Sequence, residues 1–159
     1  MSKRVVVLGL GNLLNSDEGV GVHAVRVMQN EWGARFPHVE FVDGGTLGLN
    51  LLPWVENATH LLLLDCINAK QPPATLMELT KEEIPLFAQV KMSIHQLTFQ
   101  EVLGIAKMRG KLPEHVHLIG VQPASLAIST ALSPAVQAQV PEVLRRAQDI
   151  LEQWVFSEN

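Results

Sequence analysis

Apolar residues along this chain follow two patterns: short continuous runs, and longer stretches in which they recur every three or four positions. The short runs predict five strands, at 3–10, 39–43, 59–65, 75–79 and 115–121. The runs at 3–10 and 59–65 are apolar on both sides, which is typical of central strands in a parallel sheet covered on both faces. The run at 75–79 has polar flanks bounded by prolines, which indicates a strand at the edge of the sheet.

The amphipathic stretches predict the helices that connect these strands. Helical spacing of apolar residues indicates helices at 22–31, 47–56, 95–108 and 134–154. Two of these helices start with capping signals. Ser93 precedes the third helix, and Ser133 precedes a proline in the first turn of the fourth.

Alternation of strands and helices predicts a three-layer α/β/α sandwich, with helices on both faces of a mostly parallel sheet of about five strands. Right-handed crossovers would place the second and third strands on either side of the first. The chain has no internal repeat and no linker-like stretch, so we expect a single domain over residues 1–159.

Acidic residues follow each of the first three strands. Asp17 and Glu18 come after the first, Asp43 ends the second and Asp65 ends the third. The carboxyl ends of parallel strands meet at one edge of the sheet, and ligands bind there at a topological switch point. His95 opens a predicted helix that can reach the same edge. We therefore expect a cleft lined by several carboxylates and an imidazole.

This set of residues suits a cation better than a phosphate. Gly9 and Gly11 begin a dinucleotide fingerprint, but Leu14 stands where its third glycine would be. Asp17 and Glu18 lie where a helix N-terminus would hold a pyrophosphate, and they would repel it. Carboxylates with an imidazole fit a borderline transition metal with open coordination positions, whereas calcium prefers more oxygen ligands.

Each of these residues also has a purely structural interpretation. Asp43 before two glycines can be a turn former or a cap, Glu18 can favour a helix dipole, and His95 can be a cap or a surface histidine. Asp65 ends a run of four leucines, where an unpaired carboxylate costs several kcal/mol. It therefore requires a partner, such as a metal or a substrate group.

Composition limits the partners and the compartment. The net charge of −4 argues against nucleic acid, whose phosphates need a basic face. The longest apolar runs are of strand length, and no signal-peptide pattern begins the chain, so we expect no membrane span. Cys66 is the single cysteine, which excludes an internal disulfide and suits the cytoplasm. The core accounts for the apolar face of the last helix, so we expect a monomer.

Several blocks of the sequence resemble the maturation endopeptidases of nickel–iron hydrogenases. The resemblance covers nearly the whole chain, and the order of its blocks makes it specific. The matching blocks are 9–14, 17–22, 42–46, 60–65, 91–96 and 120–123. Glu18, Asp65 and His95 match the metal-binding positions of that family, and Asp43 matches an acidic residue needed for activity.

The resemblance implies a phosphorylase/hydrolase-like fold and a single proteolytic cut. The implied substrate is the precursor of the hydrogenase large subunit after nickel insertion, and the cut removes its C-terminal extension. Nickel would be supplied by the substrate and recognised by Glu18, Asp65 and His95, so the free enzyme needs no metal of its own. Glu18 and Asp65 are also expected to take part in catalysis, together with Asp43.

Two mechanisms stay open at this point, and so does a second class of function. The metal can polarise the scissile carbonyl and activate a water, or it can position the peptide while Asp43 acts as general base. The same ligands would also serve a non-enzymatic protein that delivers nickel to a partner during assembly.

Overall fold

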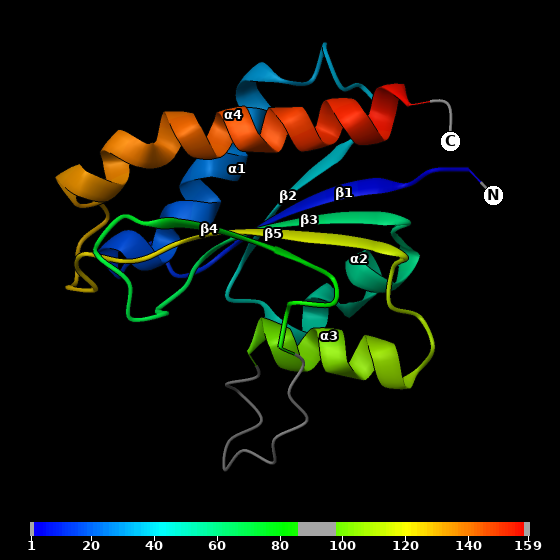
Figure 1. Ribbon diagram of the computed structural model, residues 1–159, viewed down its shortest axis with the longest axis horizontal. Helices are drawn as coiled ribbons and strands as arrows, with labels where there is room; N and C mark the ends of the chain where they lie inside the picture. Colours follow the sequence, from blue (N-terminus) through cyan, green and yellow to red (C-terminus); the bar gives the residue numbers. More distant parts are fainter. Residues whose placement is uncertain (1, 86–97, 158–159) are drawn as a thin grey trace.

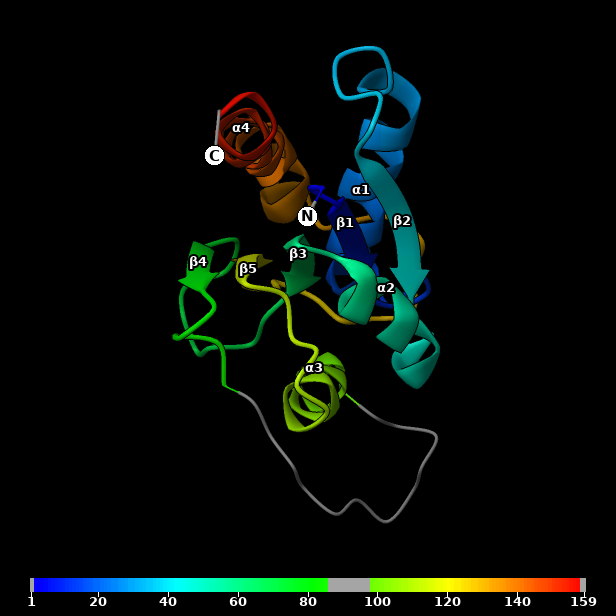
Figure 2. The same ribbon diagram turned by 90° about the vertical axis from the view of Figure 1, so that its right-hand side faces the viewer.

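The five predicted strands form one sheet in the computed structural model, which describes residues 2–85 and 98–157. The strands are β1 (Val5–Leu10), β2 (Glu40–Gly45), β3 (His60–Cys66), β4 (Leu76–Thr80) and β5 (His115–Val121). Their order is β2-β1-β3-β5-β4 (Figures 1 and 2), so the predicted placement of β2 and β3 on either side of β1 is confirmed. Four strands are parallel, and the edge strand β4 pairs antiparallel with β5.

Helices cover both faces of the sheet and complete the predicted three-layer sandwich. Figure 2 shows α1 (Val20–Glu31) and α4 (Pro134–Phe156) on one face, and α2 (Leu52–Asn57) and α3 (Phe99–Met108) on the other. Side chains of a strand alternate between its two faces. Leu62 and Leu64 of β3 therefore pack in the core under α1 and α4, while Leu61 and Leu63 pack in the core against α2 and α3. None of the helices in the described ranges is long and apolar enough to cross a membrane.

Helix boundaries differ from the predictions at several ends. The helix predicted over 47–56 is divided into a 3-10 turn, η2 (Gly48–Leu51), and α2. A second 3-10 turn, η1 (Ser16–Gly19), precedes α1. The side chain of Thr98 caps α3 by accepting a hydrogen bond from the Glu101 N–H, whereas Ser93, the predicted cap, lies outside the described residues. Ser133 caps α4 as predicted.

Two glycines bring η1 and α1 close to the sheet. A Cβ atom on Gly21 would overlap the Leu64 carbonyl oxygen, so only glycine lets the first turn of α1 pack directly on β3. Gly11 has a φ of +123°, and a Cβ atom there would overlap the Glu18 carbonyl oxygen. This close packing places the acidic residues of η1 beside the ends of β1 and β3.

Candidate functional site

A pocket of about 680 Å³ opens at the carboxyl edge of the sheet. Glu18 of η1 and Asp65 at the end of β3 both line it. The start of α3 and the η2 turn form one side of the pocket, and Pro123 and Leu126, in the segment after β5, form another. None of its lining residues within the described ranges is a lysine or an arginine, so the two carboxylates face a cavity without a protein cation on its wall.

Asp65, one of the two carboxylates of this pocket, has a strongly raised pKa. Burial raises its pKa to about 7, a hydrogen bond from the Cys66 N–H opposes that rise, and the charge of Glu18 adds to it. That hydrogen bond, from the backbone N–H of Cys66 to Oδ1, is 2.8 Å long. Asp65 and Glu18 are thus close enough to repel each other, and a cation between them would relieve both the repulsion and the cost of burial.

Asp17, the neighbour of Glu18, has a different environment. Its side chain has no exposed surface, and its two oxygens accept four hydrogen bonds from residues more than one hundred positions further along the chain. The donors are the Ala124 N–H (2.8 Å), the Ser125 N–H (2.9 Å), and the N–H (2.7 Å) and hydroxyl (2.8 Å) of Ser133. Burial raises the pKa of Asp17, but these hydrogen bonds outweigh it and hold the pKa below 3.8. Asp17 is a structural carboxylate, and Glu18 is the one that faces the pocket.

Asp43 does not share the cleft that was expected to hold all three strand-end carboxylates. Gly9 of β1 pairs with Asp43 on one side and with Leu64 on the other, so Asp43 and Leu64 lie level and point to the same face of the sheet. Asp65 is one residue further along and points to the opposite face. Asp43 instead accepts a 3.0 Å hydrogen bond from Arg26 of α1. Among the described residues, Asp43 therefore does not line the pocket of Glu18 and Asp65, because the strand register separates it from Asp65, and its expected role in activity stays a prediction.

Cys66 lines the pocket but is poorly suited to act as a nucleophile. Burial raises the pKa of its thiol to about 12, and the charges of Asp65, Glu18 and Asp17 contribute to the rise. A thiol that stays protonated at neutral pH is a weak nucleophile. Its packing against the core under α1 and α4 agrees with the small core residue that the sequence predicts.

The third predicted ligand, His95, lies outside the described residues. Over residues 2–85 and 98–157, no three His, Cys, Asp or Glu side chains gather in a way that could hold a metal ion. The described part of the site thus contributes two candidate oxygen ligands, Glu18 and Asp65. The helix that follows position 95 in the sequence begins at the pocket wall, where Thr98 and Phe99 line it.

Gln122 supports the site, although sequence reasoning did not single it out. It is buried, and its side-chain oxygen accepts hydrogen bonds from the backbone N–H groups of Ala69 (2.8 Å) and Gln71 (3.1 Å). Its amide donates to Asn68, which lines the pocket (3.1 Å). Gln122 thus holds the loop after β3 in place. The one signal in the sequence was an amide directly after a buried strand.

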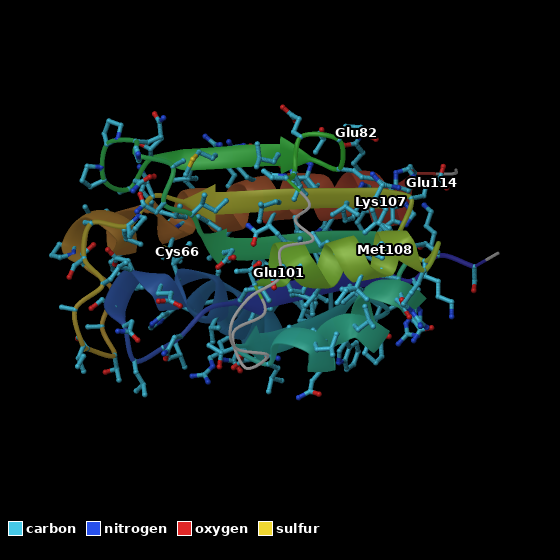
Figure 3. The ribbon with its side chains drawn as sticks, turned by 90° about the horizontal axis from the view of Figure 1, so that it is seen from below. Cys66, Glu82, Glu101, Lys107, Met108 and Glu114 are labelled. Atoms are coloured by element: carbon cyan, nitrogen blue, oxygen red, sulfur yellow. The ribbon has the colours of Figure 1, made fainter. Side chains whose placement is uncertain are left out.

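A second cavity, of about 770 Å³, lies at the opposite edge of the sheet. Glu56, one of its two carboxylates, is paired with Arg109 at 2.7 Å, and the cavity contains none of the predicted site residues. Figure 3 separates the two edges along α3: Cys66 and Glu101 lie toward one end, and Lys107, Met108 and Glu114 toward the other. Glu101 is a buried carboxylate, 4% exposed, in the first turn of α3.

The described site therefore combines two carboxylates that repel each other, a buried wall and an open mouth at a topological switch point. Such a pocket offers carboxylate oxygens to a ligand at the edge where ligands of parallel sheets bind.

The chain belongs to the hydrogenase maturation protease family, whose model matches residues 22–150. It is 38% identical over 144 residues to the hydrogenase 2 maturation protease of Escherichia coli K12. This alignment covers 90% of this chain and 87% of that protein. It is 40% identical over 152 residues to the hydrogenase expression/formation protein HupD of Thiocapsa roseopersicina, covering 94% and 68% of the two chains. The structure of the hydrogenase maturating endopeptidase HybD from E. coli matches with a TM-score of 0.82 at 35% identity, over 96% of this chain and 94% of that one.

Proposed function

We propose that this protein is the endopeptidase that removes the C-terminal extension of a nickel-loaded hydrogenase large-subunit precursor. Membership of a protease family supports a hydrolase that acts on peptide bonds. The observation that carries the proposal is the shared pocket of Glu18 and Asp65. Two carboxylates that repel each other, with no cationic residue on the described pocket wall, suit a cation that arrives with the substrate.

The nickel is part of the substrate in this proposal. Glu18 and Asp65 would each donate a carboxylate oxygen, and His95 would donate an imidazole nitrogen. This mixed set suits nickel, and three ligands leave room for the groups that already hold the metal in the precursor. The pocket opens at the edge of the sheet, where a protein substrate can approach it.

Two routes for the hydrolytic step follow from this placement. In the first, the metal polarises the scissile carbonyl and activates the attacking water. In the second, the metal positions the peptide and a carboxylate removes the proton from water, the role that the resemblance suggests for Asp43. The variant Asp43→Asn separates the routes. The second predicts loss of cleavage with retained binding of the precursor, and the first predicts only a modest loss.

The central experiment mixes the purified protein with its cognate large-subunit precursor, either nickel-loaded or metal-free. Cleavage of the nickel-loaded form alone, seen as a shorter subunit on a gel and identified by mass spectrometry, is the expected result. The variants Glu18→Gln, Asp65→Asn and His95→Ala should remain folded and fail to cleave. Nickel transfer without cleavage would overturn the proposal and would favour a delivery protein.

The proposal also includes a monomer in a reducing compartment. The apolar side chains of α4, among them Val136, Val140 and Leu151, are buried in the core of this chain and are not left for a second copy. Cys66 is a free thiol, as in proteins of the cytoplasm. Sedimentation analysis and cell fractionation test these two points.

A further inference from the structure

Large apolar side chains are exposed beside the mouth of the pocket. Leu126, which lines the pocket, is 49% exposed, and its neighbour Ile128 is 91% exposed. Leu14, in the loop after β1, is 62% exposed. We call these three side chains the apolar rim. Exposed apolar side chains that gather on neighbouring loops are typical of sites where another molecule binds.

Hydrogen bonds hold the two loops of the apolar rim together. The Ser129 N–H donates to the Leu14 carbonyl (3.0 Å), and the Ser16 N–H donates to the Ser129 carbonyl (2.9 Å). The side chain of Asn15 donates to the Leu126 carbonyl (3.3 Å). Leu14 therefore lies in one paired structure with Leu126 and Ile128, although more than one hundred residues of chain separate it from them.

Asp17 fixes the segment that carries Leu126 and Ile128. Its carboxylate binds Ala124 and Ser125 at one end of the 124–133 stretch and Ser133 at the other. A single buried group therefore closes this stretch into a loop and attaches it to η1, beside Glu18. The apolar rim is preformed, so a partner that binds it does not have to order the loop first.

The chemistry of this surface indicates its partner. The chain has no Asp, Glu, Lys or Arg from 115 to 141, and none from 9 to 16. An exposed surface without positive or negative side chains suits an apolar, uncharged segment of a partner. A charged segment would find no oppositely charged side chain there. Three aliphatic side chains expose at most a few hundred Å². That is well below the roughly 800 Å² per partner of a stable protein pair, so this surface suits a ligand that is also held elsewhere.

We propose that the apolar rim docks an uncharged, apolar segment of the substrate protein next to its scissile bond. The proposal rests on the proposed function, and it adds to it the residues that bind the polypeptide apart from the metal. Leu126 belongs to both the pocket wall and the rim, so a chain that reaches the pocket continues onto Leu14 and Ile128. The metal and the rim then bind two parts of one substrate.

The test compares Ile128→Ser and Leu14→Ser with the control Met108→Ser. Met108 is 80% exposed and lies at the far end of α3 (Figure 3), away from the pocket. All three changes remove an exposed apolar side chain, so none should unfold the protein. Each rim variant should raise KM for the nickel-loaded precursor about tenfold and leave kcat within about twofold. The control should change neither.

Other outcomes would overturn the proposal. An unchanged KM in both rim variants removes the docking role, and a loss of kcat alone moves these residues into the chemical step. A wild-type dimer that Ile128→Ser converts to monomers would identify the rim as an interface between copies. If the wild-type protein cleaves no precursor, the proposed function fails. Calorimetric titration of the precursor then still tests the rim, with tenfold weaker binding of the two rim variants expected.

Discussion

Two carboxylates at the same edge of the sheet, Asp17 and Asp65, have opposite environments. Asp17 has four hydrogen-bond donors and a pKa held below its ordinary value, whereas Asp65 accepts one hydrogen bond from the Cys66 N–H and has a pKa raised to about 7. Burial raises the pKa of both groups, so the difference comes from the larger number of donors to Asp17 and from the charge of Glu18 beside Asp65. A carboxylate whose oxygens are satisfied is typical of the scaffold, and one that is buried with few donors is typical of a site that binds a ligand.

Glu18 connects the buried Asp17 with the pocket that contains Asp65. It follows Asp17 directly, yet it lines the pocket with Asp65. The hydrogen bonds of Asp17 anchor η1, and that anchor directs the next side chain toward the pocket. Asp17 therefore positions Glu18, the proposed metal ligand, and variants can separate the roles of the two carboxylates.

The largest expected effect is the loss of processing in Asp65→Asn. The amide removes one negative charge from the pair that would hold the substrate's metal, and loss of several kcal/mol of transition-state stabilisation corresponds to about 10³-fold in rate. Single-turnover cleavage of nickel-loaded precursor measures it. Asp149→Asn, on the exposed side of α4, serves as a control and should cleave normally. Wild-type rates in Asp65→Asn would show that the perturbed carboxylate has no part in the site.

A large loss of stability is expected for Asp17→Asn. The amide brings two N–H donors to a place that already holds four donors, so at least one buried group loses its partner and the free energy of unfolding falls by about 3 kcal/mol. Urea denaturation measures it. Because the pKa of Asp17 is lowered in the folded chain, its stabilisation is present above about pH 4 and is lost as the pH falls through the folded pKa. The gap between wild type and variant should therefore close in acid.

The stability of Asp65→Asn should show the opposite dependence on pH. The folded-state pKa of about 7 lies above the unfolded value of 3.8, so protonated Asp65 favours the folded chain below about pH 4, and this contribution is lost as the pH rises through 7. The variant lacks this dependence and should be more stable than wild type by about 1–3 kcal/mol at pH 8. Denaturation at pH 5 and pH 8 provides the measurement. An equal difference at both pH values would contradict the raised pKa.

The sequence predicts the sheet well because its signals are local. Four consecutive leucines predict β3, and chain connectivity with right-handed crossovers then gives the order of the parallel strands. The same reasoning brings Glu18 and Asp65 to one edge. The predicted ends of helices were less accurate, because the cap at Thr98 and the η2 turn depend on local hydrogen bonds that the apolar pattern does not show.

The sequence could not show which acidic residues are structural and which line the pocket, for a different reason. The four donors to Asp17 come from residues more than one hundred positions away, in an irregular segment without periodicity. The direction of Asp43 depends on the pairing register of Gly9 with two strands, and a difference of one residue changes the face to which a side chain points. Tertiary contacts decide both outcomes.

Arg26→Gln gives the smallest expected effect and tests the third carboxylate, Asp43. Its 3.0 Å ion pair with Arg26 is largely open to solvent, with 54% of the Arg26 side chain and 30% of the Asp43 side chain exposed. Pairs of this kind contribute little, so the free energy of unfolding should change by less than about 0.5 kcal/mol. If Arg26 orients Asp43 as a general base, kcat for cleavage falls several-fold while KM stays constant. A stability loss above about 1 kcal/mol would instead make Asp43 a scaffold carboxylate like Asp17.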